Sequence, residues 1–461
     1  MLNLLSISPW NVACLGGALM ALAHRGDVLW GVPGILCALL LLRREIPAWR
    51  LGLAFGVMES LCIADVWLLD PAAGFLAMLG FVAYRGFLLG VLEATQSRYI
   101  RSPWTLGLFW VGCEMLHARL PLAVPNVVGD LLIDTPLRSL VSWLGTFGAG
   151  AWLVGSLALI LRRDYNLFSL GLIALGLIGG TTEHFESQVR EADQSTGIVS
   201  MIRGGVRMQE YAQRDVARHY LELSSSNPPA DLVIWPETAT GMVWNRDESW
   251  MRELSAFGMT QPILLGATRL LESGRLANGA LFIDETGVQV LDKYRQVWPI
   301  EQSYALAESS RDILTNLGRI RVLICADALD PWSIVTISSK PFELLVVLAD
   351  ASRLVDSRLR EMHLRRTQAR ALEAGTWALF VEQSETLAVI NPHGDIDVID
   401  QKLHHPGELR VNLGVLREAK RLRYWLFSWL LIGMLALMDE LLRRRQTKAM
   451  SNTEQPSESP S

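Results

Sequence analysis

The chain has 461 residues and a formal net charge of −5, and half of its residues are hydrophobic. The acidic balance argues against nucleic acid as a partner, since the chain has no basic stripe with interleaved aromatics. Residues 1–182 hold only 21 of the 89 charged residues and no lysine, so an apolar part precedes a charged one. This division excludes a soluble cytosolic enzyme and a disordered or collagen-like chain.

Apolar runs of about membrane-spanning length recur along the chain. They cover residues 6–23, 28–42, 51–69, 72–93, 103–121, 139–161, 166–181 and 424–441. We therefore predict a polytopic α-helical membrane domain of about eight spans. About seven helices form a transmembrane bundle over 1–182, and a final span covers 422–443. The tail 446–461 is polar and rich in Pro and Ser, which predicts a disordered segment.

The loops between these runs predict an orientation. The N-terminus lacks a charged n-region and an evident cleavage site, which favours a membrane anchor over a signal peptide. Basic residues collect in alternate loops, where they mark the cytoplasmic side. They are Arg43, Arg44, Arg50, Arg98, Arg101, Arg162 and Arg163, with Arg443, Arg444, Arg445 and Lys448 in the tail. Both termini are thus expected in the cytoplasm and residues 190–416 outside it.

Five ionisable residues fall inside the predicted spans: Glu59, Asp65, Arg85, Glu114 and His117. Such residues in lipid form either a functional site or pairs inside a helix bundle, and the sequence leaves both open.

The charged part alternates strand and helix patterns, which predicts an α/β domain with helices covering its sheets. Gly287 and Gly394 mark hairpin turns. Segments 238–252 and 298–312 are predicted to be mobile loops. Strands are expected at 196–202, 231–236, 262–268, 279–284, 319–325, 343–349, 377–383 and 387–392, with helices at 211–224 and 357–375.

Three reactive side chains each follow a strand pattern in this domain: Glu237, Lys293 and Cys325. Functional groups collect where strands end, because the loops there converge on a crevice. A carboxylate, an amine and a thiol together make a workable acyl-transfer site. Taken singly, each has an ordinary explanation: a solvated turn glutamate, a surface lysine and a small apolar cysteine. Because Cys325 is the domain's only cysteine, an internal disulfide is excluded, and zinc-site spacing is absent.

The surrounding residues strengthen the functional interpretation. VIWPET surrounds Glu237, DKYRQVWPIE runs from Asp292 to Glu301, and LICAD contains Cys325, in that order. This arrangement resembles the Glu-Lys-Cys triad of the nitrilase, or carbon-nitrogen hydrolase, superfamily. It is most similar to that of its membrane branch, the apolipoprotein N-acyltransferases. The segments 110–130, 135–150, 363–373 and 385–396 resemble that family too, so the resemblance covers nearly the whole chain.

The resemblance implies an αββα nitrilase-like domain inserted before the last span and a multi-pass protein of the bacterial inner membrane. The catalytic domain would lie on the periplasmic side. Cys325 would be the nucleophile that takes a fatty acyl chain from a phospholipid as a thioester. Glu237 would be the base, and Lys293 with the N–H of Ala326 would hold the oxyanion. Glu301 would orient Lys293, Asp327 would support the site, and the acceptor would be the N-terminal diacylglyceryl-cysteine of a lipoprotein or another amine. No metal or soluble cofactor is implied.

The sequence departs from the family pattern beside the nucleophile. Ala326 and Asp327 stand where the family has an aromatic residue and a glutamate, and Gln368 replaces an arginine. A nitrilase-like group among bacterial conjugal-transfer proteins is a second resemblance. Two alternatives therefore remain open: an amidase or hydrolase that uses water, and a non-catalytic membrane component linked to conjugation or envelope assembly.

Overall fold

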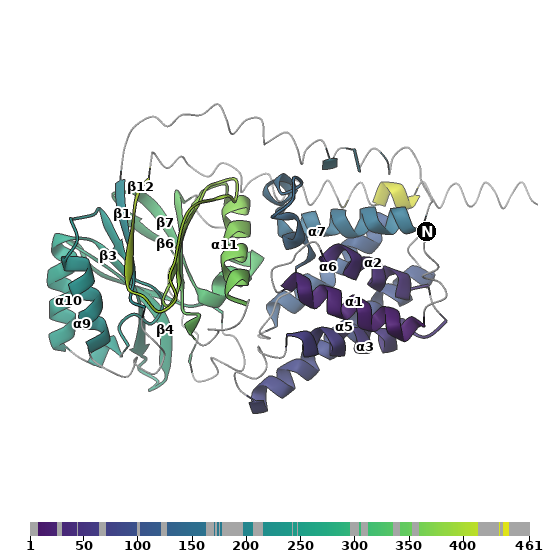
Figure 1. Cartoon of the computed structure of the whole chain (residues 1–461), viewed down its shortest axis with the longest axis horizontal. Helices are drawn as coiled ribbons and strands as arrows, with labels where there is room; N and C mark the ends of the chain where they lie inside the picture. The colour runs from purple at the N-terminus through teal and green to yellow at the C-terminus, as the bar shows by residue number, and fades with distance from the viewer. Residues whose placement is uncertain are drawn as a thin grey trace, which may run out of the picture.

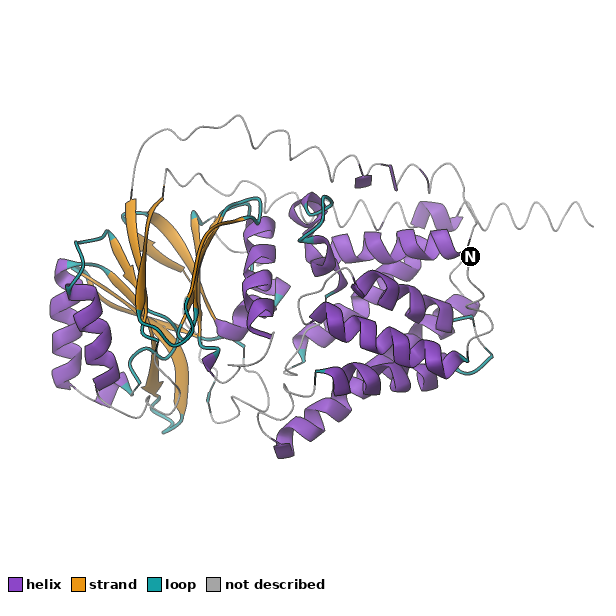
Figure 2. Cartoon of the chain, in the orientation of Figure 1, coloured by secondary structure: helices purple, strands orange, loops and turns teal. Residues whose placement is uncertain are grey.

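The computed structural model contains a bundle of helices and an α/β sandwich (Figure 1; Figure 2). It describes residues 8–24, 30–43, 45–63, 71–98, 102–120, 127–162, 170, 173–174, 176–177, 197–205, 215–241, 243–246, 248–295, 304–305, 312–334, 342–352, 359–413, 433 and 437–441.

The bundle is formed by the apolar N-terminal part. Its helices are α1 (Pro9–His24), α2 (Gly31–Leu41), α3 (Ala48–Cys62), α5 (Pro71–Arg98), α6 (Pro103–Arg119) and α7 (Ser139–Arg162), with the 3-10 helix η3 (Val128–Leu132). Ser102 starts α6 because its hydroxyl accepts the N–H of Trp104 and Pro103 follows with a helical φ.

Helices thus occupy six of the eight predicted spans. Among the described residues, two helices are long and apolar enough to cross a membrane, Gly74–Thr95 and Ser139–Arg162. The runs 166–181 and 424–441 lie mostly outside the described residues, as do Asp65 and the tail 446–461. The count of eight spans stays a prediction.

The described ionisable residues inside the bundle contact other bundle residues. Arg85 donates two hydrogen bonds to Glu59, at 2.6 and 2.7 Å, and both side chains are buried. Glu114 accepts from the indole of Trp110 and from the backbone N–H of Val128. His117 stacks on Tyr84 with ring centroids 4.0 Å apart. The described members of the set therefore make internal contacts.

The charged part folds into two six-stranded sheets. The first has the order β12-β1-β2-β3-β4-β5 and the second β11-β10-β9-β8-β7-β6. β1, β2 and β3 run parallel in the first sheet, and β7, β8 and β9 run parallel in the second. The strands are β1 (Gly197–Arg203), β2 (Leu232–Ile234), β3 (Ile263–Leu270), β4 (Leu276–Asp284), β5 (Gly287–Asp292), β6 (Asp312–Thr315), β7 (Gly318–Ile324), β8 (Leu344–Ala349), β9 (Trp377–Glu382), β10 (Thr386–Ile390), β11 (Ile396–Gln401) and β12 (Gly407–Leu413).

Three apolar layers fix the sandwich. Side chains from the inner faces of both sheets pack together, among them Ile234, Leu264, Ile324 and Val346. Helices α9 (Asp215–Ser225) and α10 (Glu248–Thr260) cover the outer face of the first sheet, and α11 (Leu359–Ala374) covers that of the second. Figure 1 shows α11 between the sandwich and the bundle. The predicted αββα sandwich is confirmed.

The predicted hairpin turns and mobile loops of the α/β domain can be compared with the structure. The hairpins at Gly287 and Gly394 are confirmed, and both glycines have a positive φ, which a side chain disfavours. The mobile loop predicted at 238–252 is wrong from Glu248 onward, where α10 begins. Trp250, Leu254 and Gly258 repeat every four residues and bury one face of that helix. In 298–312, Asp312 begins β6, and most of the rest lies outside the described residues.

Candidate active site

Glu237 lies at the carboxyl end of β2. That strand is parallel to both neighbours and buried throughout, so the chain leaves it at the edge where loops converge. The adjacent strand β3 approaches closely there, since the N–H of Gly266 donates to the carbonyl of Pro236 at 3.0 Å. A Cβ on Gly266 would lie 2.4 Å from the Cα of Glu237. Glycine is therefore required beside the candidate base.

The Glu237 carboxylate is buried and accepts hydrogen bonds on both oxygens. Its Oε1 accepts from Lys293 Nζ at 3.0 Å and from Asn278 Nδ2 at 2.7 Å. Its Oε2 accepts from the backbone N–H of Asp350 at 3.0 Å. Charge-assisted bonds of this kind are the stronger ones in proteins, so the side chain is held in one orientation.

Lys293 directly follows β5 and is buried, with 3% of its side chain exposed. Its backbone N–H donates to the carbonyl of Asn278 at 3.0 Å, which aligns it with β4. The preceding Asp292 is paired with Arg269 at 2.7 Å. The pKa of His363 on α11 is lowered to about 4, first by burial and then by the charge of Lys293.

Cys325 follows β7 and begins the 3-10 helix η6 (Cys325–Leu329). Its φ of 49° lies in the left-handed region, which costs a non-glycine residue about 1–2 kcal/mol and is typical of strained functional positions. The buried Asp327 carboxylate holds the turn, because it accepts from the N–H of Ile324 at 3.1 Å and of Arg295 at 3.0 Å. Ala326 between them is buried.

The structure therefore places two of the predicted site residues, Glu237 and Lys293, in direct contact. The third, Cys325, is linked to them through its own turn. Lys293 contacts Glu237, and the Asp327 bond to Arg295 fastens the Cys325 turn beside the Lys293 strand end. Glu301 lies outside the described residues. Among the described residues, no cluster of three or more His, Cys, Asp or Glu could hold a metal.

Two further contributors were missed by the sequence analysis. Asn278 is a polar residue inside the apolar run of β4, and that interruption was a usable signal. The donor at Asp350 is a backbone N–H, which no side-chain pattern reveals.

The chain is similar to several known proteins. Residues 206–407 match the carbon-nitrogen hydrolase family. The apolipoprotein N-acyltransferase of Methylococcus capsulatus is 28% identical over 40% of this chain and 40% of its own length. That of Azotobacter vinelandii is 24% identical over 96% of both chains. A CN-hydrolase superfamily protein from Xanthomonas campestris has a TM-score of 0.39 and 20% identity, covering 47% of this chain and 91% of its own. The chain therefore contains a carbon-nitrogen hydrolase domain at residues 206–407, and it is similar over most of its length to proteins named apolipoprotein N-acyltransferase.

Proposed function

We propose that this protein is a membrane N-acyltransferase that moves a fatty acyl chain from a phospholipid to an amine through a thioester on Cys325. The acceptor is the N-terminal diacylglyceryl-cysteine of a lipoprotein. The observation that carries the proposal is the buried contact of Lys293 Nζ with Glu237 Oε1 at 3.0 Å, next to the Cys325 turn. The names of the full-length relatives support the acyl-transfer class.

In the first half-reaction Glu237 takes the proton of the Cys325 thiol, and the thiolate attacks the carbonyl carbon of a phospholipid ester. The Lys293 ammonium and the N–H of Ala326 stabilise the tetrahedral oxyanion. The C–O bond to glycerol then breaks, and the leaving alkoxide takes the proton from Glu237. The products are a lysophospholipid and an acyl-Cys325 thioester.

In the second half-reaction the acceptor amine attacks the thioester carbonyl. Glu237 accepts a proton from the amine nitrogen as the C–N bond forms, and the same oxyanion donors act again. The C–S bond breaks, Cys325 leaves as a thiolate, and the proton on Glu237 returns to it. The amide product leaves and the site is restored. Glu301 is proposed to orient Lys293, and Asp327 to hold the Cys325 turn.

The membrane arrangement belongs to the same proposal. Eight spans would place the catalytic domain on the periplasmic side of the bacterial inner membrane, with both termini in the cytoplasm. A phospholipid acyl chain would then reach the site from the bilayer. The apolar α5 and α7 support a membrane location, and the basic loops support the orientation.

The test uses the purified full chain in detergent with a phospholipid carrying a labelled acyl chain and a synthetic diacylglyceryl-cysteine peptide. We expect label in an amide on the peptide N-terminus. Cys325→Ala should abolish it, and the control Cys14→Ala should not. Release of labelled fatty acid, unchanged by the peptide, would favour the hydrolase alternative. Absence of both products would contradict the proposal and favour a non-catalytic membrane component.

A further inference from the structure

Glu382, the last residue of β9, carries a buried carboxylate with 1% exposure. It forms no ion pair with another described residue. Instead it accepts five hydrogen bonds, four of them from backbone N–H groups. The donors are Ala351 N at 3.2 Å, Ser384 N at 2.9 Å and Ser384 Oγ at 2.7 Å on Oε1, with Glu385 N at 2.6 Å and Thr386 N at 3.0 Å on Oε2.

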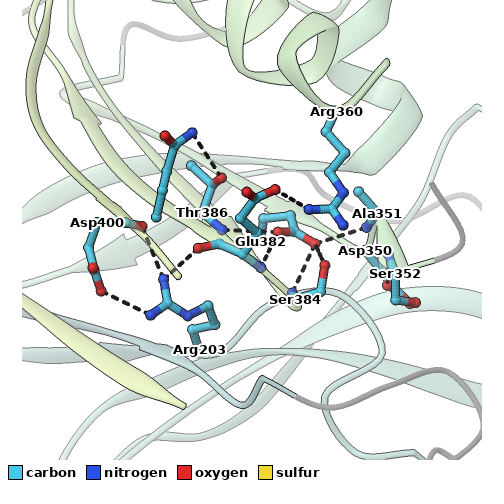
Figure 3. A network of polar contacts seen from close by, with 11 residues as sticks. Arg203, Asp350, Ala351, Ser352, Arg360, Glu382, Ser384, Thr386 and Asp400 are labelled. Atoms are coloured by element: carbon cyan, nitrogen blue, oxygen red, sulfur yellow. Dashed lines mark hydrogen bonds and ion pairs between the residues drawn. The ribbon is translucent and has the colours of Figure 1, made fainter. Parts of the chain in front are cut away.

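The hydrogen bond from Ala351 differs from the others because its donor lies outside the turn between β9 and β10. Ala351 lies in the turn that follows β8, and β8 pairs with β9 so that Ala349 faces Glu382. Figure 3 shows the Glu382 carboxylate between the two turns, with Ala351 and Ser352 on one side and Ser384 and Thr386 on the other. The Glu382 carboxylate therefore links the turn that follows β8 to the turn that follows β9.

The fastened turn contains a donor to the candidate base. Asp350 precedes Ala351, and its N–H is the group that binds Glu237 Oε2 at 3.0 Å. The Asp350 carboxylate secures the same turn from its own side by accepting from Ser352 N at 3.0 Å and from Thr238 Oγ1 at 2.9 Å. Two adjacent peptide N–H groups thus connect the two glutamates: that of Ala351 binds Glu382, and that of Asp350 binds Glu237.

We propose that Glu382 is a positioning residue for Glu237, which it orients by holding the Asp350–Ala351 turn. This inference rests on the proposed role of Glu237 as the base. Burying a carboxylate costs free energy unless donors replace its lost water, and here several N–H dipoles do so. Because the negative charge attracts the N–H of Ala351, the Asp350 N–H is held at a fixed distance from Glu237.

Neighbouring charges have separate partners. Arg360 on α11 pairs with Glu385, and Arg203 on β1 binds Asp400 at 3.0 Å, so neither neutralises Glu382 (Figure 3). The Tyr220 hydroxyl on α9, close to both Glu382 and Asp350, donates to Gln383. Lys293 contacts Glu237, the Asp350 carboxylate flanks a backbone donor of Glu237, and the charge of Lys293 acts on His363 of α11.

The test measures the rate at which iodoacetamide alkylates Cys325 in the full-length protein as a function of pH, with the modified peptide quantified by mass. This rate reports proton transfer to Glu237 without any acyl donor. Glu382→Gln removes the negative charge that attracts the N–H of Ala351, and it replaces one of the two acceptor oxygens with an NH2 group, which cannot accept. We expect the maximal alkylation rate to fall about ten-fold. The acidic limb, the part of the profile where the rate falls as the pH is lowered, should move about one pH unit higher. The limb moves up because Glu237 has lost a donor that favours its ionised form.

Two further variants separate positioning from general damage. Glu385→Gln removes one negative charge from the same turn and its ion pair with Arg360, but leaves the Ala351 bond; we expect a wild-type profile. Glu382→Asp keeps the charge and shortens the side chain by one methylene. Glu382→Asp should move the acidic limb to higher pH by a smaller amount. It also replaces Glu382→Gln as the test variant if the latter does not fold.

Equal profiles for wild type, Glu382→Gln and Glu382→Asp would overturn the inference, as would equal effects of Glu385→Gln and Glu382→Gln. A wild-type Cys325 that reacts no faster than Cys14 would also overturn it, because Glu237 would not then activate the thiol. The expected shift without acyl transfer from phospholipid would contradict only the proposed function.

Discussion

Among single residues, Asn278 is a neutral donor to the candidate base, with its Nδ2 at 2.7 Å from Glu237 Oε1. Asn278→Ala removes a charge-assisted hydrogen bond of about 1.5–3 kcal/mol, so the rate of Cys325 acylation should fall about ten-fold or more. Single-turnover acylation by a labelled phospholipid measures this. The matched control is Asn245→Ala; the Asn245 amide binds the backbone of Leu270. Equal rates for the two variants would contradict the assignment.

His363 predicts a pH dependence of stability. Its pKa is lowered to about 4 in the folded state, chiefly by burial, against about 6.5 in an unfolded chain. Between these values the unfolded state binds the proton and the folded state does not, so stability falls as pH drops from about 6.5 towards 4. At pH 5 the loss is about 2 kcal/mol relative to pH 7.

Thermal unfolding of the detergent-solubilised protein at pH 7 and pH 5 tests this. His363→Gln lacks the titrating imidazole and should show a smaller drop between the two pH values than wild type. A drop of the same size in both proteins would show that His363 does not titrate as described.

At this scale the sequence pointed to the candidate side chains but not to their hydrogen-bond partners. Glu237, Lys293 and Cys325 each follow an apolar run, and a strand end is visible in such a pattern. The donors of Glu237 depend on which strands become neighbours, and the N–H of Asp350 has no side-chain signature. For the same reason the strand pattern around Glu382 carried no hint of its five backbone and hydroxyl donors.

Among the strands, β3 approaches the carboxyl end of β2 so closely that there is no space for a side chain at Gly266. Gly266→Ala would place a methyl group 2.4 Å from both the Glu237 Cα and the Pro236 carbonyl oxygen. Because both contacts are with backbone, the strands must separate, which costs about 1–3 kcal/mol and displaces Glu237. We expect a lower melting temperature and slower acylation of Cys325.

The control for that prediction is Gly112→Ala in α6, where an added Cβ meets no atom within 4 Å. It should leave acylation unchanged and raise helix propensity. Wild-type acylation in Gly266→Ala would contradict the close approach.

Elements with strong apolar patterns were predicted well, including the central strands β2, β7 and β8. Helix α10 was missed, although Trp250 and Leu254 follow a helical repeat, because its polar residues were interpreted as a loop. The short edge strand β6 was missed because edge strands bury little apolar surface and have a weak pattern.

In the whole molecule, the α/β domain is bound to the helical bundle where α7 bends. Gly145 has a non-helical φ of 67°, which frees the N–H of Thr146 to donate to Glu373 on α11 at 2.7 Å. The Thr146 hydroxyl also binds Glu373 and accepts from Arg370 at 2.9 Å. Arg138 and Asp395 add a second link between the two parts.

Thr146→Val should therefore destabilise the protein by about 1–3 kcal/mol, since it removes one hydrogen bond from each of the buried Glu373 and Arg370 side chains. Thr105→Val is the matched control, because the Thr105 hydroxyl in α6 is buried without a hydrogen-bond partner among the described residues. Chemical denaturation of both variants in detergent measures the difference. Equal stabilities would indicate that the interface bonds contribute nothing.

The division into an apolar bundle and an α/β domain was predictable from the distribution of charge and from strand patterns. The contacts between the two parts were not, since they join residues far apart in the sequence, such as Thr146 and Glu373, which are separated by 227 positions. No local periodicity encodes a pairing over that distance.

The most direct test of the account is the intact mass of the protein purified from bacterial membranes, measured beside Cys325→Ala. We predict a fatty-acyl mass increment on the wild type that hydroxylamine removes, because a thioester is cleaved by that nucleophile, and no increment on the variant. An unmodified wild type after incubation with phospholipid, or an increment that persists in Cys325→Ala, would contradict Cys325 as the acyl-carrying nucleophile.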